Sequence, residues 1–133
     1  MKFTLENTRG IQIHGYRPGE VTLKLPAEDA TQPRQLSTYR SSLILTNTVT
    51  VENWAITHVR ELELQHFETI WQTRPGLVLL GTGQRLIFPD QKIRREFAVK
   101  GIGFEAMDTP AACRTYNVLV AEGRDVMALL IID

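Results

Sequence analysis

The hydrophobic pattern of the first part of the chain is that of β-strands. Apolar and polar residues alternate between Ile11 and Leu25, on both sides of Pro18-Gly19, and this dipeptide suits a type II turn. The alternation predicts a β-hairpin that turns one apolar face toward a core. The residues of that face are Ile11, Ile13, Val21, Leu23 and Leu25. Pro26–Gln35 mixes proline with acidic and polar residues, and this composition predicts an exposed loop.

Two strands, a helix and a further strand are predicted in the middle of the chain. Ser41–Thr46 and Glu52–Thr57 both have the composition of strands. A helical spacing follows, and Pro75-Gly76 marks its end. The apolar face of this helix consists of Leu64, Phe67, Ile70 and Trp71. Leu77–Leu80 is continuously apolar, as expected of a strand that is covered on both faces.

Another helix and a short strand come next. Asp90 is suited to cap this helix and Gly101 is suited to end it. The buried stripe of the helix consists of Ile93, Phe97 and Ala98. Gly103–Met107 then predicts the strand.

The C-terminal segment predicts a last helix and a last strand. Thr109 is suited to cap the helix, with Pro110 in the first helical position and Gly123 just past the end. The apolar run Val126–Ile132 predicts a buried strand. The whole order of elements predicts an α/β protein, with a mostly parallel sheet, helices outside it and an N-terminal antiparallel hairpin region.

Composition narrows the class of protein. A chain of 133 residues suits one domain, and its 15 basic and 15 acidic residues balance, so no overall charge favours nucleic acid. Cys113 is the only cysteine, which excludes an internal disulfide and suits a reducing compartment. The first ten residues do not resemble a signal peptide, and Val126–Ile132 is too short to span a bilayer. We therefore expect a cytoplasmic protein without membrane insertion.

Two predicted strands end in turns that could form a ligand site. In open parallel sheets, ligands bind beyond the carboxyl ends of the strands. One such end is Gly81-Thr82-Gly83 and the other is Met107–Thr109. The second turn leads into a helix, whose backbone N–H groups favour an anion. A crevice between the two turns would therefore suit a small anion.

Arg114 is the residue that suggests a negative charge near this helix. It falls in the second helical turn, where the helix dipole disfavours a cation. Its partner could be a ligand anion, or a carboxylate of Glu105, Asp108 or Glu122. Both alternatives are open from the sequence.

Three more side chains belong to the candidate site. Cys113, beside Arg114 near a helix start, is either an activated thiolate or a small buried thiol. Thr82 or Asn117 would orient the rest of a ligand. The candidate ligand-binding residues are Gly81, Thr82, Gly83, Asp108, Thr109, Cys113, Arg114 and Asn117.

The stretch Gly81-Thr82-Gly83 resembles a phosphate-binding loop but lacks its other parts. A dinucleotide fingerprint needs a small residue at position 86, which is Leu86. No Gly-Lys-Ser/Thr follows, and Gln84–Pro89 separates the turn from the next helix. The turn is therefore predicted to give backbone room to a neighbouring loop.

The chain offers little for a metal or for nucleic acid. Glu63 and His66 form one E-x-x-H pair, but di-iron sites need two such pairs and further carboxylates. Arg94-Arg95 is followed by Glu96 and predicts an exposed charged face. No metal and no cofactor are predicted, and no catalytic constellation is visible.

Most of the chain resembles the MTH-type domain family of uncharacterised bacterial and archaeal proteins. Its relatives include mitochondrial respiratory complex I assembly factor 3 and an adipogenesis-associated MTH-type protein. The likeness rests on the block Phe104–Ile131 and on "SSLIL", Trp54, Gly81-Thr82-Gly83, Pro89, Glu105-x-Met107-x-Thr109, Ala112-x-Arg114-Thr115-Tyr116-Asn117 and Glu122-Gly123-Arg124. The resemblance implies a single domain over residues 1–133, with three layers around a mixed sheet, and no established activity. Pro26–Gln35 is longer than is typical of the family, and no mitochondrial transit peptide is visible.

Two functions follow as hypotheses. The first is a non-catalytic interaction or assembly-factor-like module with a protein partner, as the family resemblance implies. The second is a binding protein or an enzyme with a small-anion or nucleotide-like ligand between Gly81–Gly83 and Asp108–Arg114. The lack of an acid–base or metal constellation favours the first.

Overall fold

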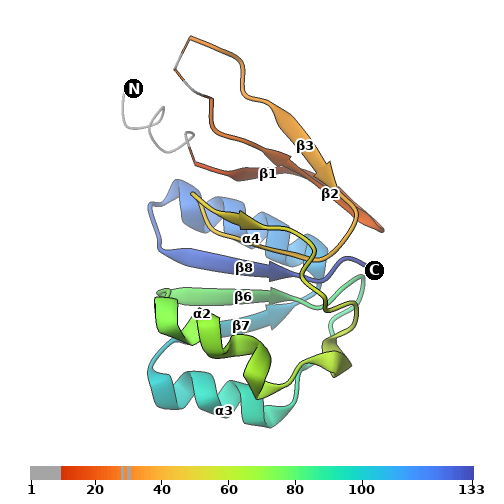
Figure 1. Cartoon of the computed structure of the whole chain (residues 1–133), viewed down its shortest axis with the longest axis vertical. Coiled ribbons are helices and arrows are strands. Elements are labelled where there is room, and N and C mark those ends of the chain that lie inside the picture. The colour runs from red at the N-terminus through yellow and green to blue at the C-terminus, as the bar shows by residue number, and fades with distance from the viewer. Residues whose placement is uncertain (1–9, 28, 30) are drawn as a thin grey trace.

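A computed structural model describes residues 10–27, 29 and 31–133, which form two β-sheets and a set of helices (Figure 1). The smaller sheet is antiparallel, in the order β1-β2-β3. Its strands are β1 (Gln12–Arg17), β2 (Glu20–Lys24) and β3 (Leu36–Tyr39). The predicted hairpin is confirmed, since Arg17 pairs with Glu20 across Pro18-Gly19 and Gly19 has a φ of 84°.

The larger sheet has five strands in the order β5-β4-β8-β6-β7. These are β4 (Leu43–Leu45), β5 (Thr50–Val51), β6 (Leu77–Gly81), β7 (Gly103–Met107) and β8 (Val126–Leu130). Strand β6 is parallel to β7 and β8, whereas β4 is antiparallel to β5 and β8. The predicted α/β class with a mixed sheet is therefore confirmed.

Helices lie on both faces of the larger sheet. They are the short 3₁₀ helices η1 (Val59–Glu61) and η2 (Leu64–Phe67), and the α-helices α2 (Glu68–Thr73), α3 (Gln91–Lys100) and α4 (Thr109–Ala121). Helix α4 lies between the two sheets, and α2 and α3 lie on the opposite face of the larger one (Figure 1). Strand β8 contributes to both cores, since Ala128 and Leu130 pack toward α4 while Met127 and Leu129 pack toward α2 and α3.

Glu52–Thr57 is not a strand, contrary to the prediction. Strand β5 ends at Val51, and Asn53 has a φ of 56°, which turns the chain out of the sheet. The Trp54 N–H then donates to the Ser42 carbonyl at 2.9 Å. Strand β3 was not predicted, and it pairs with β2 at the far edge of the smaller sheet.

The helix boundaries are confirmed in part. Asp90 caps α3 and Gly101 ends it with a φ of 72°, as predicted, but Ala98 is exposed. Leu64 lies in η2, before α2 begins, and is 36% exposed, so it does not extend a buried face. The cap of α4 is Asp108 and not Thr109: its carboxylate accepts the Ala111 N–H at 2.8 Å.

Candidate functional site

The two predicted turns lie side by side, but they close on each other. The Gly83 N–H donates to Thr109 Oγ1, and the Thr109 N–H donates to the Gly83 carbonyl, both at 2.8 Å. At Gly81, an added Cβ would lie 2.9 Å from Thr109 Oγ1 and 3.0 Å from Thr109 Cα. Gly81 therefore allows close packing of β6 against α4, and Gly83, which is bonded to Thr109, does not line an open crevice.

Both threonine hydroxyls of the predicted site hold the backbone. Thr109 is fully buried, and its hydroxyl donates to the Ile131 carbonyl at 2.8 Å. Thr82 is 3% exposed; its hydroxyl donates to the Arg85 carbonyl at 2.6 Å and accepts the Ile87 N–H at 3.1 Å. Neither hydroxyl is presented to a ligand.

The first turn of α4 has already used its N–H groups. The Ala111 N–H donates to the Asp108 carboxylate, the Ala112 N–H donates to the Asp108 carbonyl, and Pro110 has no N–H. A second carboxylate, that of Asp133, accepts the Gln84 N–H at 3.2 Å beside the same turn. These contacts do not support a small-anion site between the two turns.

Three of the eight predicted residues come together elsewhere, in a groove of about 250 Å³ between β1 and α4. Its lining consists of Ile13, His14, Gly15, Tyr16, Pro110, Cys113, Arg114 and Asn117. A bulge in β1 between Ile13 and Gly15 shapes one wall. Arg114 is exposed and forms no salt bridge with any residue in the described part of the chain, so the expected carboxylate partners are not engaged.

Asn117 joins the two sheets through α4. Its Oδ1 accepts the Ile13 N–H at 2.8 Å, and its Nδ2 donates to the Ile13 carbonyl at 2.7 Å. The hydroxyl of Tyr116, one residue earlier, donates to the Ile11 carbonyl at 2.8 Å. The Asn117 amide therefore continues the hydrogen bonding of β1 and is occupied by the fold.

Cys113 is a buried thiol at the base of the groove. Its side chain is 4% exposed, and burial raises its pKa from 9.0 to about 12, against the opposing effect of the Arg114 charge. Burial is also the largest cause of the raised pKa of Tyr16, and the negative charges of Asp133, Cys113 and Asp108 raise it further. The activated-thiolate hypothesis is therefore not supported.

We expect Cys113 to resist thiol reagents while the chain is folded. A pKa raised from 9.0 to about 12 lowers the thiolate fraction at neutral pH by about a thousandfold, and burial hinders access further. Release of thionitrobenzoate from an aromatic disulfide reagent should be slow in buffer and rapid in concentrated urea. The Cys113→Ser variant gives the background, and rapid modification of the native chain would contradict the assignment.

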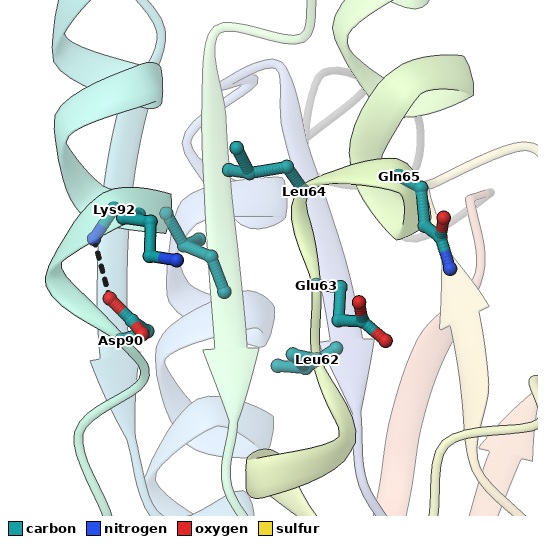
Figure 2. A pocket seen from close by; sticks show the side chains of 7 residues that line it. Leu62, Glu63, Leu64, Gln65, Asp90 and Lys92 are labelled. Carbon is teal, nitrogen blue, oxygen red and sulfur yellow. Dashed lines mark hydrogen bonds between the residues drawn. The ribbon is translucent and has the colours of Figure 1, made fainter.

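A second groove, of about 310 Å³, separates the Leu62–Gln65 segment from the start of α3 (Figure 2). In this view Leu64 points toward α3, and the Asp90 carboxylate accepts the Lys92 N–H at 2.9 Å. The Glu63–His66 pair has a structural role, because the Glu63 N–H donates to His66 Nδ1 at 2.9 Å. Among the described residues, no three potential ligands lie close enough together to hold a metal ion.

The largest of these hollows was not predicted. It has a volume of about 550 Å³ and lies between α2 and the β4–β5 hairpin; we call it the α2–β5 hollow. Its lining consists of Ile44, Leu45, Thr46, Val49, Val51, Trp54, His66, Thr69, Ile70, Thr73 and Met127. The signal in the sequence is weak, since only Val49 and Val51, both about half exposed, interrupt the polar stretch Thr46–Asn53.

A second unpredicted feature is an apolar group on the loop after β6. Leu86 is 47% exposed and Phe88 is 64% exposed. The Arg94 guanidinium carbon lies 5.7 Å from the centroid of the Phe88 ring. We call Leu86, Phe88 and Arg94 the Phe88 surface.

Known proteins that resemble the chain include one named as a membrane protein and several named as assembly factors. A "13 kDa major membrane protein" of Francisella tularensis is 33% identical over 94 residues, which cover 70% of this chain and 76% of that protein. The bovine "NADH dehydrogenase [ubiquinone] 1 alpha subcomplex assembly factor 3" is 34% identical over 83 residues, 61% of this chain. The match covers only 45% of the bovine protein. In the described part of the chain, no helix has the length and apolar character needed to cross a membrane.

Solved structures share the fold, and the sequence match extends over most of the chain. A Xanthomonas campestris protein has a TM-score of 0.76 and 29% identity, covering 95% of this chain and 87% of that one. A Bordetella pertussis protein described as a Mth938-like domain has a TM-score of 0.70 at 24% identity, covering 95% and 88%, and shows the same fold. The family described as "Protein of unknown function (DUF498/DUF598)" matches residues 13–131, and this protein therefore belongs to that family, as its MTH-type resemblance indicated.

Proposed function

We propose that this protein is a non-catalytic interaction module that helps a larger protein complex to assemble. The observation that carries the proposal is its similarity to proteins named as assembly factors of NADH dehydrogenase, over 61% of this chain. The hydroxyls of Thr82 and Thr109 and the amide of Asn117, all from the predicted ligand site, also support it, because they are hydrogen-bonded within the fold. A cytoplasmic location is part of this proposal, and subcellular fractionation tests it.

The Phe88 surface is the contact site we assign to the partner. Aromatic residues and arginine are enriched among the residues that dominate binding energy at protein interfaces. Phe88 is the most exposed of the large aromatic side chains in the described residues, and Arg94 stacks near it. An exposed aromatic ring that is covered on binding would contribute most of its apolar area to the complex.

The loop that carries this surface is held in place before any partner binds. The Thr82 hydroxyl bonds to both the Arg85 carbonyl and the Ile87 N–H, and Ile87 packs against the core beside α3. Ordering a loop costs entropy on binding, so a loop that is already ordered leaves more of the contact energy for affinity. Leu86 and Phe88 alternate with Ile87, and they face outward while Ile87 faces inward.

Replacing Phe88 by alanine should weaken partner binding without weakening the fold. A tagged wild-type chain should recover one protein from a native lysate in near-stoichiometric amount, and the Phe88→Ala variant should bind that purified protein at least about thirtyfold more weakly, as for an interface hot spot. Val99→Ala is the matched control, because Val99 is 78% exposed on α3 and lies outside the surface. Repeated failure of the wild-type chain to recover a partner would contradict the function. If Phe88→Ala bound the partner as tightly as the wild-type chain does, the assignment of the Phe88 surface as the contact site would be wrong.

A further inference from the structure

The α2–β5 hollow has the size and lining of a site for a small apolar molecule. Its volume of about 550 Å³ falls within the range of about 300–1,000 Å³ found for small-molecule sites. None of its described lining residues is Asp, Glu, Lys or Arg. A buried water molecule needs two or more polar partners, so most of this wall would hold water poorly.

The apolar part of the wall comes from both sides of the hollow. Ile70 on α2 and Met127 on β8 are buried, while Val49 and Val51 form a half-exposed rim on the hairpin and Trp54 adds an aromatic side. A methionine in such a wall adapts its shape to what it contacts. A linear apolar chain would therefore contact apolar side chains along its length, from the half-exposed Val49 and Val51 to the buried Ile70 and Met127.

The polar groups gather on the wall formed by η2 and α2. His66, Thr69 and Thr73 are spaced at one helical turn and line the hollow together with Ile70. The Thr73 hydroxyl donates to the Ile70 carbonyl at 2.8 Å and is occupied. On the opposite wall, the Thr46 hydroxyl accepts the Val49 N–H at 3.1 Å and lies 3.4 Å from the Thr48 hydroxyl.

His66, which lines the hollow, has one ring nitrogen available as a hydrogen-bond donor. Its Nδ1 accepts the Glu63 N–H at 2.9 Å, so the neutral ring carries its proton on Nε2. Neither His66 Nε2 nor the Thr69 hydroxyl bonds to another residue in the described part of the chain. Two donor-bearing residues on the η2–α2 wall of an apolar hollow match a ligand whose head group accepts hydrogen bonds.

We propose that the α2–β5 hollow binds a single-chain amphipathic carboxylate, with its apolar chain against Val51, Trp54 and Met127 and its carboxylate at His66 and Thr69. A fatty acid of medium chain length has this chemistry. The proposal goes beyond the assembly function and uses a different surface from the Phe88 surface.

Calorimetric titration of the whole chain with hexanoate, octanoate and decanoate, each below its micelle concentration, tests the chain-length dependence. Affinity should rise about fourfold for each added methylene group, because each one buries apolar surface. Decanoate should bind more tightly than decanol, and decanol more tightly than decylammonium, because the protein supplies donors. An affinity that does not depend on chain length, or a preference for decylammonium, would overturn the proposal.

Two variants locate the site. Val51→Asp places a charge on the rim and should weaken decanoate binding at least about tenfold, whereas Val99→Asp on α3 and Phe88→Ala should bind as the wild type does. Thr69→Val should reduce the preference for decanoate over decanol by about threefold. Val51 is 48% exposed, so its substitution spares the core, and unchanged circular dichroism confirms folding. If Val51→Asp binds decanoate as tightly as the wild-type chain does, the α2–β5 hollow is not the binding site. The proposal is also overturned if the wild-type chain forms a dimer that Val51→Asp dissociates.

Discussion

Replacing Thr109 by valine is expected to lower the free energy of unfolding by about 2–5 kcal/mol. Valine has nearly the shape of threonine, so the packing of this fully buried residue against Gly81 would be kept. The substitution removes the acceptor for the Gly83 N–H and the donor to the Ile131 carbonyl, both at 2.8 Å. Two buried backbone groups would lose their partners, and this loss has a large cost in a closed site.

Urea unfolding followed by tryptophan fluorescence and circular dichroism measures this effect. Thr109→Ser is the matched control, since it keeps the hydroxyl and should recover much of the lost stability, less the cost of the missing methyl group. A Thr109→Val variant as stable as the wild type would mean that this hydroxyl does not hold β6, α4 and the segment after β8 together.

Replacing Asn117 by leucine is expected to lower the free energy of unfolding by about 2–4 kcal/mol and to loosen the smaller sheet first. The amide of Asn117 bonds to both the N–H and the carbonyl of Ile13, so its loss leaves both groups of β1 without this partner. Tyr116 still holds Ile11, and the apolar contacts of Ile13 and Leu23 remain. We therefore expect local opening of β1–β3 to become easier than global unfolding.

Hydrogen exchange followed by mass spectrometry distinguishes local from global loss. Peptides from β1, β2 and β3 should exchange faster in Asn117→Leu, while those from β6 and β8 should change little below the unfolding transition. Val118→Leu, at an exposed neighbouring position of α4, is the matched control. Uniform acceleration across both sheets would contradict the proposed role of Asn117 as the link between them.

Local signals in the sequence predicted several elements correctly, because neighbouring residues decide them. Pro18-Gly19 formed the hairpin turn, and Asp90 and Gly101 bounded α3. The prediction of a strand at Glu52–Thr57 was wrong for a reason that composition does not reveal. Asn53 has a positive φ, which turns the chain out of the sheet just after β5. The cap of α4 was misplaced by one residue because both Asp108 and Thr109 suit an N-cap, and the hydroxyl of Thr109 is bonded across the sheet.

The nearness of the two turns was predicted, but their closure on each other was not. Parallel strands end at the same edge of a sheet, so the proximity of Gly81–Gly83 to Thr109 followed from topology. Whether the space between them was open depended on how closely β6 approaches α4. The hydrogen bonds between Gly83 and Thr109 close that space. Cys113, Arg114 and Asn117 instead face β1, a strand about a hundred residues earlier in the chain, as the separation of 104 between Ile13 and Asn117 shows.

The sequence by itself determined the α/β class, most of the strands and helices, and the family, because these depend on local hydrophobic periodicity, turn residues and a long block of matching residues. Only the tertiary structure decided which polar groups are hydrogen-bonded within the fold and where hollows remain. Such features arise from contacts between distant segments. Thr109 meets Gly83 and Ile131, and α2 faces the β4–β5 hairpin across the α2–β5 hollow, although neither contact has a signature along the chain.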